Sequence, residues 1–212
     1  MPATRLATRL AAALVVTATC AVTAPPAPRP PLNDDQRLVN ALPAAVTAPA
    51  PGYDRTLFGG WEDLDGDGCT ARQAVLLRDL TEQATAQDRP TECTTVLSGR
   101  LTDPYTGVSV ITDVEHVDID HRVALRDAWA AGANTWTEQW RQDFANDEDN
   151  LLAVLPSVNR AKGSRGPDQW RPSGDKAARC AYAAGYARTK ARWELGVTDA
   201  QRTALLEALN GC

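Results

Sequence analysis

The stretch DVEHVDIDHRVAL, residues 113–125, contains both histidines of this 212-residue chain, His116 and His121. Four acidic residues stand among them: Asp113, Glu115, Asp118 and Asp120. A neutral imidazole acts as a general base near pH 7, and a neighbouring carboxylate can hold a hard cation. Taken alone, the stretch leaves two interpretations open, because histidines on the edge of a strand are also common surface residues.

A second polar cluster lies downstream in NDEDNLLAVLPSVNRAKGS, residues 146–164. A short apolar run follows Asn150 and ends at a proline, as in a buried strand. The loop or helix after it carries three polar side chains: Asn159, Arg160 and Lys162. We expect one compact metal site that faces a phosphate. It would be formed by a strand that ends in Asp-His, a second strand, and a helix that carries Asn and Lys.

In these residues the chain resembles the HNH endonucleases, which have a ββα-metal (His-Me finger) fold. The family signature is Asp-His at the end of a first strand, Asn at the start of a second, and His or Asn on a helix. Here these positions are Asp120-His121, then Asn150 in DNLLAV, then Asn159 in NRAKG. The wider sequence, residues 60–212, is similar to secreted bacterial HNH proteins related to the C-terminal domain of GmrSD-type modification-dependent nucleases. The resemblance implies an α+β fold, with a ββα-metal core and surrounding helices.

The resemblance also implies a role for each signature residue. His121 would be the general base that takes a proton from the attacking water. Asp120 and Asn159 would hold one divalent cation, with an oxygen of the scissile phosphate as a further ligand. Asn150 would brace the loop between the strands and so orient His121. An all-oxygen set of ligands suits Mg²⁺ or Mn²⁺ better than Zn²⁺.

Four nearby residues have weaker assignments. Arg160 and Lys162 are expected to contact substrate phosphates, although a solvated helix face explains them equally well. His116 has no counterpart in the signature and is expected to be a polar partner near the start of the strand. Asp118 stands two residues before Asp120 and shares its face of the strand, where it would support the ligands.

Residues 1–21 have the pattern of a signal peptide. Arg5 and Arg9 form a positive segment, and the apolar run after them is too short to span a bilayer. Cleavage after Ala21 is favoured, which predicts a secreted, extracellular protein. Lipid anchoring at Cys20 is the less favoured alternative. No other apolar run is long enough for a membrane helix.

Residues 22–52 are expected to be a linker. Eight of the fourteen prolines stand between positions 25 and 51, mixed with alanines, and such a stretch is typical of extended chain. Within it NDDQRLVNAL, residues 33–42, could form one or two helical turns. The folded HNH endonuclease domain is expected to comprise residues 53–212 and to be a monomer.

The cysteine count agrees with secretion. Once Cys20 is removed with the signal, four cysteines remain: Cys69, Cys93, Cys180 and Cys212. An even number in an oxidising compartment predicts disulfides, and four thiols permit three pairings. The pairs Cys69–Cys93 and Cys180–Cys212 are favoured, because each brackets one compact segment. Zinc ligation is not indicated, since no CxxC or HxxxH spacing occurs.

The spacing of apolar residues in the domain predicts mixed α and β structure. Thr70 with Gln73, and Thr198 with Gln201, have the spacing of capping boxes that begin helices. Turn residues between two apolar runs predict a hairpin over residues 97–111. Helices are expected at residues 70–80, 125–147 with a break near Gly132 and Asn134, 175–195 with Asp175 as N-cap, and from 198 to the glycine at 211.

The charge pattern suits a nucleic-acid substrate despite a net charge of −5, which the loss of Arg5 and Arg9 takes to −7. Residues 111–150 hold ten Asp/Glu and three Lys/Arg, whereas residues 151–200 hold nine Lys/Arg and four Asp/Glu. A basic half beside an acidic, metal-loading half fits a phosphodiester backbone. We expect an endonuclease for nucleic acid, with DNA as the favoured substrate and little sequence specificity.

Three other interpretations of the sequence are less favoured. DLDGDG, residues 63–68, matches the start of a calcium loop, but Ala74 stands where an EF-hand needs Glu, so a plain acidic turn is favoured. A secreted metallohydrolase acting on cell-wall or peptide bonds would need more strong ligands than two histidines supply. A non-catalytic binding module would use tryptophans as a platform, but Trp129, Trp136 and Trp140 have the spacing of core residues.

Overall fold

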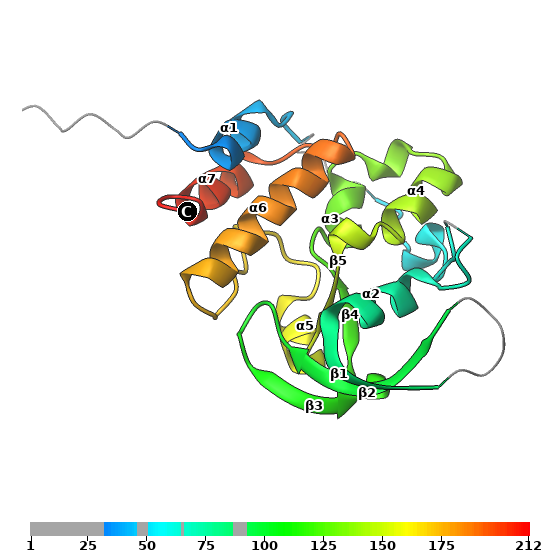
Figure 1. Cartoon of the computed structure of the whole chain (residues 1–212). Helices are drawn as coiled ribbons and strands as arrows, with labels where there is room; N and C mark the ends of the chain where they lie inside the picture. The colour runs from blue at the N-terminus through cyan, green and yellow to red at the C-terminus, as the bar shows by residue number, and fades with distance from the viewer. Residues whose placement is uncertain (1–31, 46–50, 65, 87–92) are drawn as a thin grey trace, which may run out of the picture. The chain divides into compact units, whose positions relative to one another are not determined.

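The computed structural model of the chain describes residues 32–45, 51–64, 66–86 and 93–212 (Figure 1). The expected signal peptide, Cys20 and the first part of the expected linker lie outside these residues. The described chain contains both helices and strands, which confirms the expected α+β class. Among its helices, none is long and apolar enough to cross a membrane.

One antiparallel sheet has the strand order β1-β2-β3. Its strands are β1 (Leu80–Ala86), β2 (Thr95–Thr102) and β3 (Ser109–Asp113). Asp103 fixes the turn between β2 and β3, because its carboxylate accepts hydrogen bonds from the backbone N–H groups of Tyr105 and Thr106 at 3.0 and 2.9 Å. Gly107 supplies a positive φ of 75° in the same turn. The hairpin expected over residues 97–111 is confirmed.

A second, two-stranded sheet carries the histidine of interest. β4 (Asp118–His121) pairs antiparallel with β5 (Leu151–Val154), and His121 lies opposite Leu151. Helix α5 (Pro156–Lys162) follows β5 after one residue and packs against β4. It begins with Pro156, whose missing N–H is not needed in the first turn of a helix. Two antiparallel strands and a helix therefore lie together in one unit.

Helix α2 (Ala71–Asp79) connects the two sheets, since it packs against both β2 and β5. The predicted capping box of Thr70 and Gln73 is present at its start. The buried side chains of α2 and the strands form one apolar cluster, which includes Val75, Leu76, Leu101, Val117, Ile119 and Leu151. Full burial of such a side chain contributes about 1.5–3 kcal/mol, so this cluster fixes β4 and β5 against α2.

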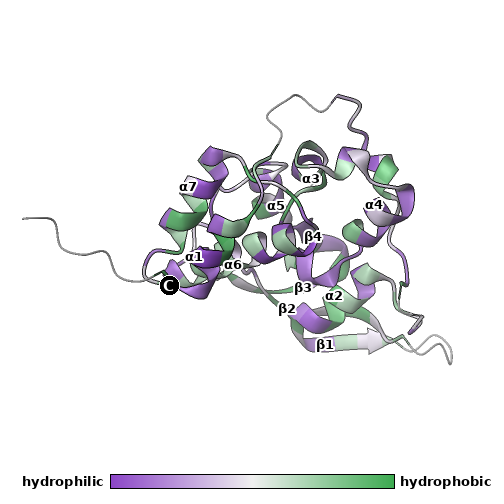
Figure 2. Ribbon diagram, turned by 90° about the horizontal axis from the view of Figure 1, so that it is seen from above, coloured by the Kyte–Doolittle hydropathy of each residue, from purple (hydrophilic) through white to green (hydrophobic). Residues whose placement is uncertain are grey.

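The remaining helices build a larger apolar core. They are α3 (Leu125–Ala130), α4 (Glu138–Ala145), α6 (Lys176–Arg192) and α7 (Asp199–Ala208), with the 3₁₀ turns η1 (Arg55–Phe58), η2 (Val114–His116), η3 (Ala133–Thr135) and η4 (Glu148–Asn150). Gly132, at φ 137°, separates α3 from α4 as expected. The predicted N-caps Asp175 and Thr198 are also present. Hydrophilic and hydrophobic residues alternate along α4 and α7 (Figure 2), because one side of each helix packs inward.

The tryptophans expected in the core are only partly there. Trp129 is 8% exposed, and Trp136 packs against Phe144 and Trp193 with ring centroids 5.5 and 5.6 Å away. Trp140 is 50% exposed, although its ring touches those of Trp136 and Trp193. Spacing along the chain could not show that Trp140 lies at the edge of this aromatic group.

Helix α1 (Asp34–Ala41) corrects the expected domain boundary. This part of the expected linker belongs to the folded unit, where α1 packs against α6 and α7. Asn33 and Gln36 form a capping box, and Val39 and Leu42 are buried in the larger core. The one or two helical turns expected in residues 33–42 are confirmed, but their assignment to an extended linker was wrong, because the prolines flank the segment and leave its interior free to form a helix.

Both expected disulfides are present, Cys69–Cys93 and Cys180–Cys212. Their Cα atoms are 4.9 and 5.9 Å apart, within the ordinary range for disulfides. The first joins the start of α2 to the segment before β2, and the second joins α6 to the end of the chain. Each half of the fold therefore has one covalent link.

Candidate functional site

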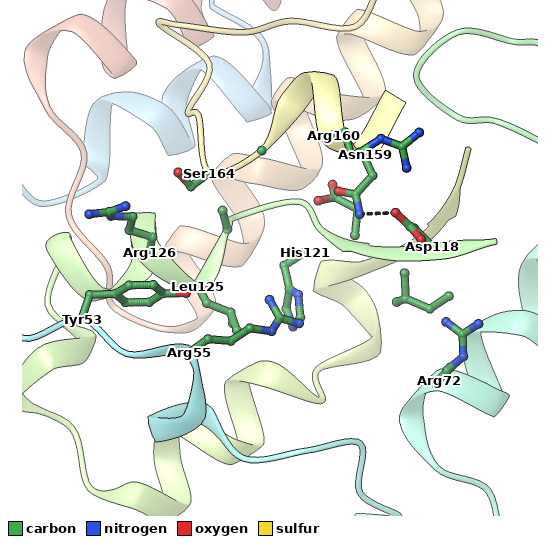
Figure 3. A pocket seen from close by; sticks show the side chains of 14 residues that line it. Tyr53, Arg55, Arg72, Asp118, His121, Leu125, Arg126, Asn159, Arg160 and Ser164 are labelled. Carbon is green, nitrogen blue, oxygen red and sulfur yellow. Dashed lines mark hydrogen bonds between the residues drawn. The ribbon is translucent and has the colours of Figure 1, made fainter. Parts of the chain in front are cut away.

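A pocket of about 480 Å³ opens where β4, α5, α3 and η1 meet (Figure 3). Four residues with expected functions line it together: Asp120 and His121 from β4, and Asn159 and Arg160 from α5. The other lining residues are Tyr53, Arg55, Arg72, Asp118, Ile119, Ala124, Leu125, Arg126, Gly163 and Ser164. The two polar clusters of the sequence thus meet at one surface.

His121 is the last residue of β4 and is 5% exposed. Its Nε2 lies 2.8 Å from the carbonyl oxygen of Ala145, which can only accept, so Nε2 carries the proton and Nδ1 has the free lone pair. The ring of Trp61 stacks on the imidazole, with centroids 5.9 Å apart and planes at 9°. Burial lowers the pKa of His121 to about 3; the hydrogen bond to Ala145 opposes this shift, and Arg55 and Lys162 add to it. The imidazole is therefore neutral at neutral pH.

Asp120 is also 5% exposed, and both of its carboxylate oxygens accept a hydrogen bond. Lys162 Nζ donates to Oδ1 at 2.9 Å, and the hydroxyl of Tyr105 donates to Oδ2 at 2.7 Å. Burial raises the pKa of Asp120, while Lys162 and Tyr105 hold that rise back. The close ammonium favours the charged carboxylate, which still has lone pairs for a further ligand.

Lys162 does not face solvent, and the expectation that it contacts a substrate phosphate is wrong. Its side chain is fully buried, and besides pairing with Asp120 it donates to the backbone carbonyl of His121 at 2.8 Å. The sequence could not show this, because a lysine at the end of a short helix can point either outward or under the neighbouring strand. Arg160 is exposed at the pocket and available to a phosphate.

Asp118 and Asn159 connect β4 to α5. Nδ2 of Asn159 donates to Oδ2 of Asp118 at 2.9 Å, which is the dashed contact in Figure 3. This contact uses the amide nitrogen and leaves the amide oxygen for another ligand. Asp118 thus orients Asn159, as a supporting residue on the same face of the strand as Asp120 would.

The oxygen atoms that could hold a hard cation belong to Asp118, Asp120 and Asn159. In the described ranges, no three His, Cys, Asp or Glu side chains gather closely enough to hold a metal ion. A cation at this place would therefore depend on the amide of Asn159 as well as on carboxylates. The chemistry of these donors fits Mg²⁺ or Mn²⁺.

Asn150 is fully buried at the end of η4 and clamps the chain just after His121. Its Oδ1 accepts from the N–H of Val123 at 2.8 Å, and its Nδ2 donates to the carbonyl of Val123 at 3.2 Å. Its own carbonyl accepts from the N–H of Arg122 at 2.8 Å. These contacts put Asn150 where it can brace the loop that leaves β4.

Sequence reasoning missed the residues that reach the site from other segments: Tyr53, Arg55, Trp61, Arg72 and Arg126. Arg126 could have been found, because it stands directly after the quoted stretch, residues 113–125. No local pattern links the other four to His121, since they lie far before it in the chain. Only the packing of η1 and α2 against β4 and α3 brings them there.

Two features singled out in the sequence lie outside the pocket. His116 has a side chain that is 69% exposed, 3.8 Å from Glu115. The carboxylate of Asp63 accepts from the backbone N–H groups of Gly66 and Gly68 at 2.8 and 2.9 Å, as in an ordinary turn. Both observations agree with the plainer interpretation of each feature.

Residues 70–208 match the family described as GmrSD restriction endonucleases, C-terminal domain. A protein from Arthroderma benhamiae, named as an uncharacterized secreted protein, is 37% identical over 206 residues, which cover 94% of this chain and 97% of that protein. No solved structure gives a significant match. The matched range contains both sheets and α5. It also contains both polar clusters of the sequence, residues 113–125 and 146–164. The chain therefore belongs to the family of the GmrSD restriction endonuclease C-terminal domain.

Proposed function

We propose that this protein is a secreted endonuclease that hydrolyses phosphodiester bonds of nucleic acid. It uses a histidine base and one divalent cation, Mg²⁺ or Mn²⁺. DNA is the expected substrate, with little sequence specificity, and the active form is a monomer. In this proposal β4, β5 and α5 are the ββα-metal core. Membership of a family named for restriction endonucleases supports a nuclease-related activity.

The observation that carries the proposal is a neutral histidine held at the wall of a pocket that contains both oxygen ligands and arginines. A general base needs a free lone pair near pH 7 and a fixed direction. Nδ1 of His121 has the lone pair because Nε2 is bound to Ala145. The stacked ring of Trp61 restricts rotation of the imidazole.

The reaction follows from these groups. His121 accepts a proton from a water molecule as the water oxygen bonds to phosphorus, and the bond to the leaving oxygen then breaks. The leaving oxygen takes a proton from solvent. Lys162 and Asn150 fix the backbone that carries the His121 side chain. Lys162 donates to the carbonyl of His121, and Asn150 accepts from the N–H of Val123. General-base catalysis of this kind contributes about 10²–10⁴-fold to a rate.

Asp120 and Asn159 would hold the cation, whose charge stabilises the negative charge that develops on the phosphate and leaving oxygens. Lys162 pairs with the same carboxylate at 2.9 Å, so its ammonium competes with the cation for Asp120. Asp118 keeps Asn159 in place through its amide nitrogen. This division leaves Asp118 as a positioning residue and not as a ligand.

The substrate side of the pocket is cationic. Arg160 is exposed at its edge and is the residue of α5 that we expect to contact a phosphate. Arginine contacts to phosphates carry no base information, which agrees with little sequence specificity. They also offset the negative net charge of the chain where the substrate binds.

Secretion is supported by three separate observations. The first 21 residues have the charge and apolar pattern of a signal peptide. The four remaining cysteines form two disulfides, as is usual in oxidising compartments. The relative from Arthroderma benhamiae is named as a secreted protein.

A plasmid-nicking assay tests the proposed function. The mature chain from residue 22 is incubated with supercoiled DNA in Mg²⁺, in Mn²⁺ and in EDTA. Nicked and linear products should form only with a cation, and His121→Ala should form them about 10²–10⁴-fold more slowly. A parallel reaction with RNA decides between the two polymers. Absence of cleavage of DNA and RNA by folded protein, with either cation, would reject the proposal.

A further inference from the structure

Arg55 and Arg126 line the same pocket as the residues proposed to hold the cation. In Figure 3 Tyr53 and Arg126 lie on one side of His121 and Asn159 lies on the other, while the side chain of Arg55 extends from the Tyr53 side to the imidazole. The guanidinium carbon of Arg126 lies 5.6 Å from the centre of the Tyr53 ring. Two guanidinium groups thus line the pocket, Arg126 beside the Tyr53 ring and Arg55 between that ring and His121.

Both guanidinium groups are available for a ligand. Arg55 and Arg126 are exposed, and within the described residues neither has a hydrogen-bond or ion-pair partner. Arg72 differs, because it donates to the carbonyls of Val114 and Val117 at 3.0 and 3.1 Å and so holds the chain before β4. A guanidinium offers five N–H donors in one plane, an arrangement that matches the oxygens of a phosphate.

The segment that carries Arg55 is anchored to the core. Phe58, the last residue of η1, is fully buried, and its ring lies 6.3 Å from the rings of Trp129 and Phe144. Asp54 caps η1 by accepting from the N–H of Thr56 at 2.9 Å. The position of Arg55 is therefore set by packing before any substrate arrives. This segment lies outside the range that matches the family.

We propose that Arg55 and Arg126 bind the phosphate next to the scissile one on the same nucleic-acid strand. This inference rests on the proposed function, in which the scissile phosphate lies between His121 and Asn159. A strand that continues past His121 toward Tyr53 would bring its next phosphate within reach of Arg55 and Arg126. Charge-assisted N–H···O bonds from the two arginines would hold that phosphate and fix the strand's direction. The enzyme then selects polynucleotides over isolated phosphodiesters.

Two substrates separate this role from a role in the chemical step. An oligonucleotide has a neighbouring phosphate, whereas bis(p-nitrophenyl) phosphate has a single phosphodiester. Arg55→Gln and Arg126→Gln should each lower kcat/KM for the oligonucleotide about tenfold more than for bis(p-nitrophenyl) phosphate, as expected for a hydrogen bond to a charged group. Arg171→Gln, at an exposed arginine outside this pocket, is the matched control and should leave the ratio unchanged.

A binding experiment identifies the phosphate itself. In the His121→Ala background, where cleavage should be about 10²–10⁴-fold slower, oligonucleotides with one neutral methylphosphonate linkage are titrated by fluorescence anisotropy. The neutral linkage next to the cleavage position should weaken binding about tenfold when both arginines are present. The same linkage should cause no further loss in the Arg55→Gln/Arg126→Gln variant. The salt dependence of binding should also fall by about one ion per arginine removed.

The outcomes distinguish this inference from the proposed function. If the wild type cleaves neither substrate, the proposed function fails, while the binding titration still tests the arginines. Equal losses on both substrates would mean that the arginines act on the reacting phosphate, which would overturn the inference. Additive losses from the neutral linkage and the double variant would also overturn it, since they would place the arginines against a base or another phosphate.

Discussion

Lys162 and Lys190 have the same kind of surroundings in two different regions of the molecule. Each is fully buried, and each ammonium donates to a backbone carbonyl. Lys162 pairs with Asp120 at 2.9 Å beside the pocket, and Lys190 pairs with Asp127 at 3.1 Å between α6 and α3. We call Asp120–Lys162 the site pair and Asp127–Lys190 the scaffold pair.

The two aspartates differ in the number of protein donors that they accept. Asp120 accepts from its lysine and from the hydroxyl of Tyr105. Asp127 accepts from its lysine, from the hydroxyl of Tyr186 and from the amide of Gln201 at 3.0 Å. The third donor, from α7, joins three helices at one carboxylate. Asp120 lacks such a donor and keeps capacity for a ligand, so similar buried chemistry serves structure in one region and a site in the other.

The largest effect that the comparison predicts is at the histidine next to the site pair. His121→Ala should lower the rate of cleavage about 10²–10⁴-fold, because the proposed general base is lost while the proposed cation ligands Asp120 and Asn159 remain. Cation binding should persist in this variant. The rates are measured on plasmid DNA, with folding checked by circular dichroism.

His116→Ala is the control for that loss. Its side chain is 69% exposed and lies outside the pocket, so most of the activity should remain. An equal loss in both histidine variants, with cation binding gone from both, would indicate a two-histidine metal site. That result would remove the basis for separating the site pair from the scaffold pair.

Breaking the scaffold pair should cost stability and leave the chemistry alone. Lys190→Met leaves Asp127 charged and partly buried, and loss of one partner of a buried pair typically costs about 3–5 kcal/mol in the free energy of unfolding. Burial lowers the pKa of Lys190, and Asp127 opposes that shift. The aspartate therefore favours the charged form of the buried lysine. Urea unfolding measures the loss, and active-site titration gives the rate per folded molecule.

The double variant Asp127→Leu/Lys190→Met should recover part of this loss, because two apolar side chains replace the pair without leaving a buried charge. A rate per folded molecule that falls tenfold or more in either variant would contradict the assignment of this pair to the scaffold.

Removal of the lysine from the site pair should make stability depend on the cation. In Lys162→Met the carboxylate of Asp120 loses its competing ammonium, so Mg²⁺ should bind more tightly. At about 100 times the dissociation constant, a ligand that binds only the folded state adds about 2.7 kcal/mol. The wild type should gain less, and Lys190→Met should gain only as much as the wild type.

Thermal unfolding in Mg²⁺ and in EDTA, at matched ionic strength, measures these gains. The proposed cation site would be in error if Mg²⁺ stabilised all three proteins equally, or if it stabilised none of them. The difference between the variants matters more than the absolute values, because unfolded chains differ little in their affinity for Mg²⁺ at fixed ionic strength.

Local signals in the sequence predicted much of the fold. The capping boxes at Thr70 and Thr198, the break at Gly132 and the hairpin around Asp103 each depend on a few adjacent residues. Both disulfide pairings were also predicted, because short closed segments limit the choice. The helical turns expected in residues 33–42 are present as α1, but the flanking prolines led to their assignment to the linker and not to the folded domain.

The sequence predicted the site residues that stand in one ordered motif, but not the residues that reach the site through tertiary packing. Asp120, His121 and Asn159 stand in an ordered motif, and the structure brings them to one pocket. The direction of Lys162 and the arrival of Arg55 depend on tertiary packing, which no spacing in the sequence encodes. The residues that distinguish the site pair from the scaffold pair were therefore visible only in the structure.

The smallest effect concerns the third donor to the scaffold pair, and two similar capping boxes make it measurable. Gln73 accepts from the N–H of Thr70 at 3.0 Å, and Gln201 accepts from the N–H of Thr198 at 3.2 Å. Only Gln201 also donates to Asp127. Gln73→Ala should cost up to about 1 kcal/mol, as for loss of part of a cap. Gln201→Ala should cost about 1.5 kcal/mol more, because it also loses a hydrogen bond to a charged group.

Thr70→Ala and Thr198→Ala provide the matched controls, since each removes the N-cap and leaves the glutamine in place. They should lower the free energy of unfolding by about the same 1 kcal/mol. Chemical unfolding of the four variants isolates the contribution of the Gln201–Asp127 bond as a difference between differences. In the Lys190→Met background the Gln201 loss should grow, because the amide then remains one of only two donors to Asp127. Equal losses for the two glutamines, in both backgrounds, would show that the third donor does not stabilise Asp127 and that donor number does not separate the two pairs.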